Sequence, residues 1–113
     1  MINPLKGEHE LELAGKTYKT RLTIDALVKI ETALNKGVIE IVTELTNARV
    51  RIFWLMTILT HALRGGGNDI QDQDVKDILM KEGIANATIK VATLLANSLN
   101  EGSDETVKKN PEE

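Results

Sequence analysis

The chain has 113 residues, a formal net charge of −3 and no cysteine. A chain of this length forms one domain with a modest core, and the lack of cysteine excludes disulfides and thiolate metal sites. Acidic and basic residues are interspersed and only 3% of residues are aromatic. This composition argues against the basic face and the stacking platforms of nucleic-acid binders.

Membrane insertion is not expected either. The longest apolar stretch, residues 52–63, is interrupted by two threonines and a histidine, whereas a membrane-spanning helix needs about 20 apolar residues. The N-terminal residues lack the apolar segment of a secretion signal. These features predict a cytoplasmic protein that contacts neither membrane nor nucleic acid.

Residues 8–22 alternate apolar and polar side chains in two runs, separated by a short connection at 14–17 that contains glycine. This pattern predicts a β-hairpin. Two registers fit the sequence. A two-residue loop pairs Leu11 with Tyr18, whereas a loop centred one residue later pairs Leu13 with Tyr18. Because an isolated hairpin is marginally stable in water, one face must pack on helices.

A helix is predicted over 24–35, with Thr23 as its N-cap and Gly37 as the stop signal after it. The next segment, 38–46, has apolar residues at helical spacing, and we interpret it as a short helix because a strand would scatter them on both faces. Glu31 falls within the apolar arc of the first helix. That arc consists of Ile24, Leu27, Val28, Ile30 and Leu34.

The central element is a predicted helix over 48–64, capped by Asn47, which holds the only Trp and the only Phe. At about 100° per residue its apolar side chains fall on two faces. One face is the predicted core, and it consists of Ala48, Ile52, Leu55, Met56, Leu59 and Leu63. The other face, Val50, Trp54 and Ile58, is either covered within the chain or a partner surface. If Trp54 is fully buried within one chain, this candidate partner surface fails.

Two further helices are predicted, over 71–82 with acidic residues in the first turn, and over 86–100. Residues 65–67 form a flexible connection before them. The polar segment 101–113 cannot bury enough surface to fold and is predicted to be disordered. The predicted fold is α+β and mostly α: an N-terminal hairpin on four to five helices, in one compact domain over 1–100.

No catalytic, metal or cofactor site emerges from the motifs. The glycines at 65–67 lack the lysine and the preceding strand of a phosphate loop. Residues 68–74 lack the glycine that a calcium-binding loop requires at its sixth position. His61 has no histidine or acidic residue at helical spacing, and His9 lies in the predicted hairpin, which leaves metal ligation on a helix unsupported. We therefore expect a protein that is not an enzyme and binds no cofactor.

Glu31 breaks the apolar pattern of its helix. A buried carboxylate needs a charged or hydrogen-bonding partner, and Arg49, Arg51 and Arg64 are the candidates for a structural ion pair. Alternatively, Glu31 lies at the rim of the core and stays solvated.

Several short motifs follow one another in a definite order. They are Gly7-Glu8, Gly15-Lys16-Thr17-Tyr18, Lys19-Thr20-Arg21-Leu22-Thr23, Ala26-Leu27, Ile30-Glu31, Ala62-Leu63-Arg64-Gly65-Gly66-Gly67, Asp72-Gln73-Asp74-Val75 and Glu82-Gly83-Ile84. This ordered combination, over about residues 5–100, resembles the small gene-transfer-agent family proteins encoded among phage-like tail genes. That family is grouped with tail assembly chaperones, or labelled tail tube-associated.

The resemblance implies a non-enzymatic role in tail assembly, as a chaperone that binds a tape-measure or tail tube protein. It carries over no binding residues. One alternative is a structural tail component of a gene-transfer-agent or prophage particle, and another is a helical adaptor module unrelated to phage. The expected location is the cytoplasm of a bacterial host or a phage-like particle. A homo-oligomer remains open.

Overall fold

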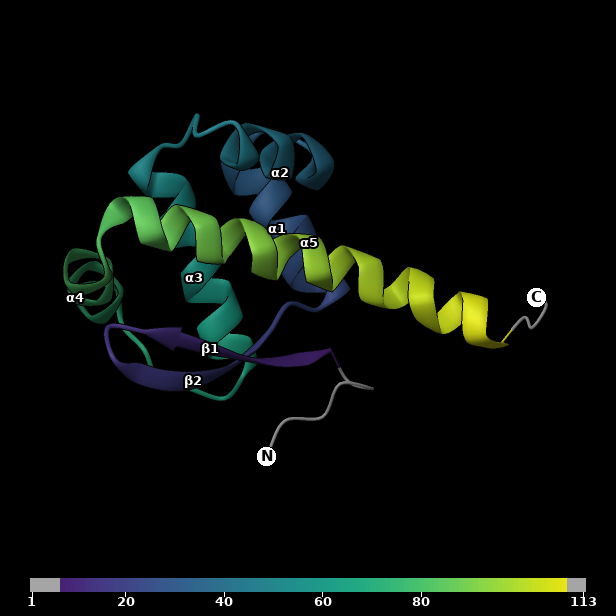
Figure 1. Cartoon of the computed structure of the whole chain (residues 1–113), viewed down its shortest axis with the longest axis horizontal. Coiled ribbons are helices and arrows are strands. Elements are labelled where there is room, and N and C mark those ends of the chain that lie inside the picture. The colour runs from purple at the N-terminus through teal and green to yellow at the C-terminus, as the bar shows by residue number, and fades with distance from the viewer. Residues whose placement is uncertain (1–6, 110–113) are drawn as a thin grey trace.

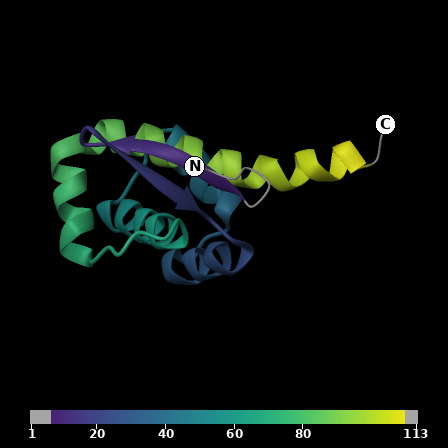
Figure 2. The same cartoon turned by 90° about the horizontal axis from the view of Figure 1, so that it is seen from below.

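The computed structural model describes the backbone of residues 7–109 and the side chains of residues 7–100. It confirms a two-stranded hairpin followed by five helices (Figure 1). The hairpin comprises β1 (Glu8–Leu13) and β2 (Lys16–Arg21), and the helices are α1 (Ile24–Leu34), α2 (Val38–Thr46), α3 (Ile52–Gly65), α4 (Asp72–Glu82) and α5 (Ile84–Lys109). Helix α5 runs along the long axis, and its C-terminal part extends away from the other elements (Figures 1 and 2).

The strands pair antiparallel in the first of the two predicted registers, with Leu11 opposite Tyr18. The loop is Ala14-Gly15, and both residues have positive φ, 54° and 79°. Positive φ at both central residues is what a tight type I′ hairpin turn requires. One face of the hairpin is buried, since Leu13 is fully buried against the helices.

Helix α1 is capped at both ends. Thr23 is the N-cap of α1 as predicted, and its hydroxyl accepts a hydrogen bond from the amide of Ala26 at 3.1 Å. Asn35 ends α1 in the left-handed region at φ 57°. The predicted apolar arc is only partly buried, because Ile24 and Val28 are exposed.

Helix α3 begins at Ile52, four residues later than predicted. Asn47 does not cap it; Asn47 is the C-cap of α2. The amide of Arg49 donates to the carbonyl of Glu44 at 2.8 Å, and Ala48 has a φ of 60°. This is the bonding of a Schellman-type helix end. Because α2 uses these amides, the next helix cannot start until the chain has turned.

The glycines at 65–67 were predicted to form a flexible connection. Two of them instead bring the end of α3 into close contact with β2. Gly65 is the last residue of α3 and Gly66 is its C-cap. A Cβ on Gly65 would overlap the carbonyl oxygen of Arg21, and a Cβ on Gly66 would overlap that of Lys19. The side chain of Asn68 strengthens this contact by donating to the carbonyl of Lys19 at 2.7 Å.

The last two helices meet at Gly83, which has a φ of 90°. Helix α4 begins at Asp72, and the Asp74 carboxylate accepts a hydrogen bond from the amide of Gln71 at 2.9 Å. Helix α5 starts two residues earlier than predicted, and its backbone continues past residue 100 to Lys109. Residues 110–113 of the predicted disordered tail lie outside the described residues.

The core draws on the hairpin and on every helix. Fully buried side chains come from all seven elements, and they include Leu13, Thr20, Ile30, Ile41, Leu55, Val75 and Leu95. Figure 2 shows α1 and α3 on one side of the molecule, the hairpin and α5 on the other, and α4 closing one end. None of the helices described over residues 7–109 combines the length and the apolar composition that crossing a membrane requires.

Candidate functional site

Most of the candidate partner surface of Val50, Trp54 and Ile58 is buried within the chain. Ile58 is fully buried and Trp54 is only 7% exposed, both within one chain. The two predicted faces of α3 are parts of one wide buried arc, because Ala62 lies between Ile58 and Leu55 and all three are fully buried. Helix α3 is covered by β2, α1, α4 and α5, so both faces meet neighbours. Ile58 is therefore unavailable to a partner.

Val50 and Trp54 nevertheless reach a surface pocket between α2 and the start of α3. The pocket has a volume of about 340 Å³, and its lining residues are Lys36, Glu44, Arg49, Val50, Arg51 and Trp54. The Lys36 ammonium lies 6.0 Å from the centre of a Trp54 ring, within the range of a cation–π contact. The lining thus combines two apolar side chains with three basic ones and one acidic one.

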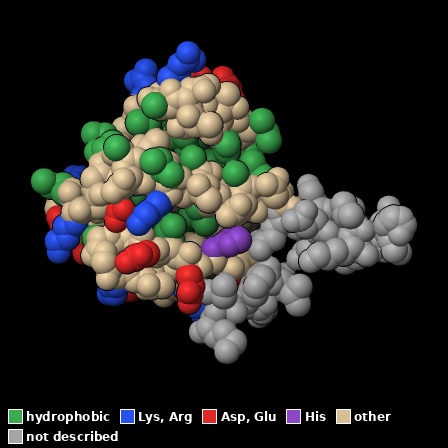
Figure 3. Space-filling view, viewed as in Figure 1, with side chains coloured by type: hydrophobic (Ala, Val, Ile, Leu, Met, Phe, Trp, Pro, Cys, Tyr) green, Lys and Arg blue, Asp and Glu red, His purple; other side chains and the backbone are tan. Residues whose placement is uncertain are grey.

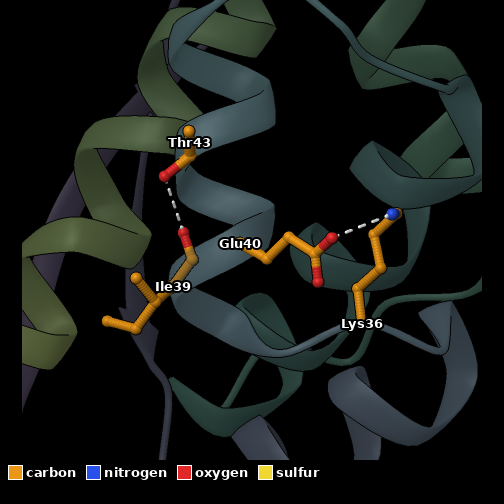
Figure 4. Close-up of polar contacts among 4 residues, drawn as sticks. All are labelled: Lys36, Ile39, Glu40 and Thr43. Atoms are coloured by element: carbon orange, nitrogen blue, oxygen red, sulfur yellow. Dashed lines mark hydrogen bonds and ion pairs between the residues drawn. The ribbon is translucent and has the colours of Figure 1, made fainter.

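Lys36 is held by α2. Its Nζ lies 3.3 Å from Oε2 of Glu40 (Figure 4). In the same view Ile39 points to the opposite side of α2 from Glu40, and Thr43 donates to the Ile39 carbonyl at 3.1 Å. Helix α2 therefore supplies Glu40, which pairs with Lys36 of the pocket, and presents Ile39 on its opposite side.

Two large apolar side chains stand exposed in the first turn of α3. Ile52 is 55% exposed and Phe53 is 60% exposed, although the sequence placed Ile52 in the core. Phe53 also lines a second surface pocket, which lies between α3 and Asp72 at the start of α4. Other exposed apolar side chains include Ile39 on α2 and Ile89 on α5, and hydrophobic side chains interrupt the polar surface over these two helices in Figure 3.

Glu31 does not pair with an arginine. Its Oε2 accepts a hydrogen bond from the amide of Val38 at 2.9 Å. No ion pair joins Glu31 to Arg49, Arg51 or Arg64, all four of which lie in the described part of the chain. The carboxylate therefore caps the free amide at the start of α2, in place of the predicted ion pair with a guanidinium.

The two histidines lie in different environments. Burial lowers the pKa of His61, and the positive charges of Lys29 and Arg64 lower it further. His9 lies in the hairpin, where its carbonyl accepts a hydrogen bond from the hydroxyl of Thr20 at 3.0 Å. Within residues 7–100 no three or more His, Asp or Glu side chains gather in a group that could hold a metal ion.

A family comparison decides the class of this protein. The family described as phage tail tube protein, GTA-gp10, matches residues 6–101, well over half of the chain. The chain belongs to this family. GTA-gp10 family members are phage tail assembly chaperones with a non-enzymatic role, and that role implies binding of tail proteins. No curated protein and no solved structure matches the chain.

In this GTA-gp10 family protein, the residues that sequence reasoning missed are the arginines beside Trp54. Arg49 and Arg51 were considered only as partners of Glu31, yet both are exposed and line the pocket. The signal in the sequence is the order Arg49-Val50-Arg51-Ile52-Phe53, in which basic side chains precede exposed apolar ones. Such mixed surfaces are typical of protein interfaces, which are enriched in Arg, Trp and Phe.

Proposed function

We propose that this chain is an assembly chaperone that binds a tape-measure or tail tube protein before that protein is incorporated into a tail, in the cytoplasm of a bacterial host. The observation that carries the proposal is the exposed pair Ile52 and Phe53 beside the pocket of Val50 and Trp54. Contiguous exposed apolar patches mark binding surfaces in soluble proteins.

The family match supports the tail-assembly context and removes the alternative of a helical adaptor unrelated to phage. The alternative of a structural tail component stays in view, because the family's description names a tail tube protein. Both alternatives share binding to tail proteins. They differ in whether the chain remains in the finished particle.

Deletion of the coding sequence tests the proposal, with particle production as the readout. We expect loss of tails or particles, restored by the wild-type chain on a plasmid. Mass spectrometry of purified particles then separates the alternatives: a chaperone is absent from mature particles, whereas a structural component is present in fixed stoichiometry. Normal particle yield from the deletion strain would refute both.

The binding surface is tested by replacing Ile52 and Phe53 with serine. The two side chains are exposed, so the double variant should fold as the wild type does. We expect reduced binding to purified tape-measure or tail tube protein. The matched control is Met80→Ser on α4, which is also exposed but lies on another element. Equal binding by both variants would remove the start of α3 from the proposal.

Self-association, which the sequence leaves open, is a second use for exposed apolar side chains such as Ile39 and Ile89. Size-exclusion chromatography with light scattering on the full chain measures it directly. A monomer over the whole accessible concentration range would exclude it.

A further inference from the structure

We propose that the pocket beside Trp54 docks an acidic segment of the partner tail protein that also carries apolar side chains. This inference rests on the proposed function and specifies the chemistry of the partner. Its basis is the combination of apolar side chains at the start of α3 with exposed arginines that form no ion pair with the described residues.

The charge of the pocket is opposite to that of the whole chain. Three basic side chains and one acidic side chain line it, whereas the net charge of the chain is −3. Lys36 is already paired with Glu40. Among the described residues no ion pair involves Arg49 or Arg51, and both side chains are exposed. Two guanidinium groups are therefore available to carboxylates, which they can bind through two parallel hydrogen bonds.

The start of α3 adds to this positive potential. Its N-cap residue, Arg51, makes no side-chain cap hydrogen bond, and the first turn contains no acidic residue. The N-terminus of a helix carries a partial positive charge that acidic first-turn residues usually complement. Here a carboxylate from a partner would complement it, alongside the two arginines.

The apolar component of the site decides against a purely ionic ligand. Val50 and Trp54 supply the apolar lining of the pocket, and Ile52 and Phe53 stand exposed in the adjoining turn. Arg is among the residues most enriched at interface hot spots, and Phe is enriched at interfaces as well. A segment that alternates carboxylates with apolar side chains would satisfy both parts of the surface.

The same features favour a protein over a nucleic acid. Glu44 lines the pocket and Glu40 lies beside Lys36, so a continuous phosphate backbone would meet carboxylates as well as arginines. Trp54 is mostly covered and offers no open ring face on which bases could stack.

The fluorescence of Trp54 provides a direct test, because it is the only tryptophan in the chain. The full chain is titrated with a synthetic helical peptide, free of tryptophan, that has leucine on one face and glutamate elsewhere. The comparison peptide has lysine in place of every glutamate. We expect a saturable change in Trp54 emission with the glutamate peptide and none with the lysine peptide. The apparent Kd should rise about tenfold as the salt concentration is raised from low to high, because exposed ion pairs are screened.

The double variant R49E/R51E should weaken binding of the glutamate peptide by about tenfold or more, since two attractive contacts become repulsive. The matched control, K76E/K81E, makes the same change in net charge on exposed positions of α4 and should bind as the wild type does. The salt titration on the wild-type chain needs no variant, so misfolding of R49E/R51E cannot hide the answer.

Four results would overturn the inference. Two concern the peptides: no emission change with the glutamate peptide, or equal binding of the lysine peptide. The third is tighter binding of a single-stranded oligonucleotide. The fourth is an emission change that depends on protein concentration without any peptide, which would assign the pocket to a second copy of the chain. Failure of the proposed function is seen separately. In that case purified tape-measure and tail tube proteins would not bind the chain at any salt concentration, whatever the peptides do.

Discussion

The carboxylate of Glu82, at the end of α4, accepts a hydrogen bond from the backbone amide of Ala14 in the hairpin turn, with 2.7 Å between Oε1 and the nitrogen. Its other oxygen lies 2.9 Å from Nζ of Lys90, which in turn donates to the carbonyl of Glu12 at 2.6 Å. The Glu82 side chain is only 9% exposed. A single carboxylate therefore links the hairpin turn to the corner between α4 and α5.

This link makes stability depend on pH. The hydrogen bond from Ala14, followed by the contact with Lys90, holds the pKa of Glu82 below its ordinary value and outweighs the opposing effect of burial. The folded protein thus binds this proton less tightly than the unfolded chain. The stabilisation is complete above the ordinary glutamate pKa of about 4.3 and is lost as the pH falls through the lower folded value.

The variant Glu82→Gln tests this dependence. Urea unfolding of the wild type and the variant between pH 3 and 7 should show a gap in unfolding free energy that is widest near neutral pH and closes below about pH 4. The control, Glu10→Gln, replaces an exposed glutamate of β1 and should show a much smaller gap. A gap for Glu82→Gln that is constant with pH would contradict the assignment.

The contact between α3 and β2 predicts a large effect of a single methyl group. Gly66→Ala forces a Cβ against the carbonyl oxygen of Lys19, a backbone atom that cannot rotate away. We expect a loss of about 3 kcal/mol in unfolding free energy, at the upper end of overpacking effects. In Gly37→Ala the added Cβ meets only the Glu31 carboxylate at 3.7 Å, and we expect a loss below about 1 kcal/mol. Equal losses would show that the helix end is free to shift.

The pair Ile58 and Ile52 tests which face of α3 is core. Ile58→Ala removes a fully buried side chain and should lower the unfolding free energy by about 2–5 kcal/mol. Ile52→Ala makes the same chemical change at a half-exposed position and should lower it by less than about 1 kcal/mol, helped by the higher helix propensity of alanine. Denaturant melts measure both. The reverse order would restore the faces predicted from sequence.

The hydrogen bond from the Val38 amide to Glu31 predicts that substitutions of Glu31 destabilise the protein to different degrees. Glu31→Ala removes the acceptor of the Val38 amide and should destabilise by about 1–2 kcal/mol. Glu31→Gln keeps a side-chain oxygen and should lose less. A double-mutant cycle with Arg64→Met should be additive within about 0.5 kcal/mol, because the two side chains share no contact. Strong coupling would revive the ion pair.

The sequence by itself determined the local structure. The hairpin, the cap at Thr23 and the number of helices were predictable because strand alternation, capping and helical periodicity depend on residues close together in the chain. The ordered motifs also pointed to the family, which the match over residues 6–101 confirms.

Only the tertiary structure decided which faces are covered and which groups meet. Periodicity defines the apolar arc of α3 but not how many neighbours surround it. The sequence therefore left Trp54 and Ile58 undecided between core and partner surface, and it placed the exposed Ile52 in the core. The free backbone amides at the two ends of α2 decided two further features. The Arg49 amide bonds to the Glu44 carbonyl and so delays the start of α3, and the Val38 amide bonds to the Glu31 carboxylate. The pocket of Arg49 and Arg51 beside Trp54 exists because the chain turns between the end of α2 and the start of α3. Such a turn leaves no periodic pattern in the sequence.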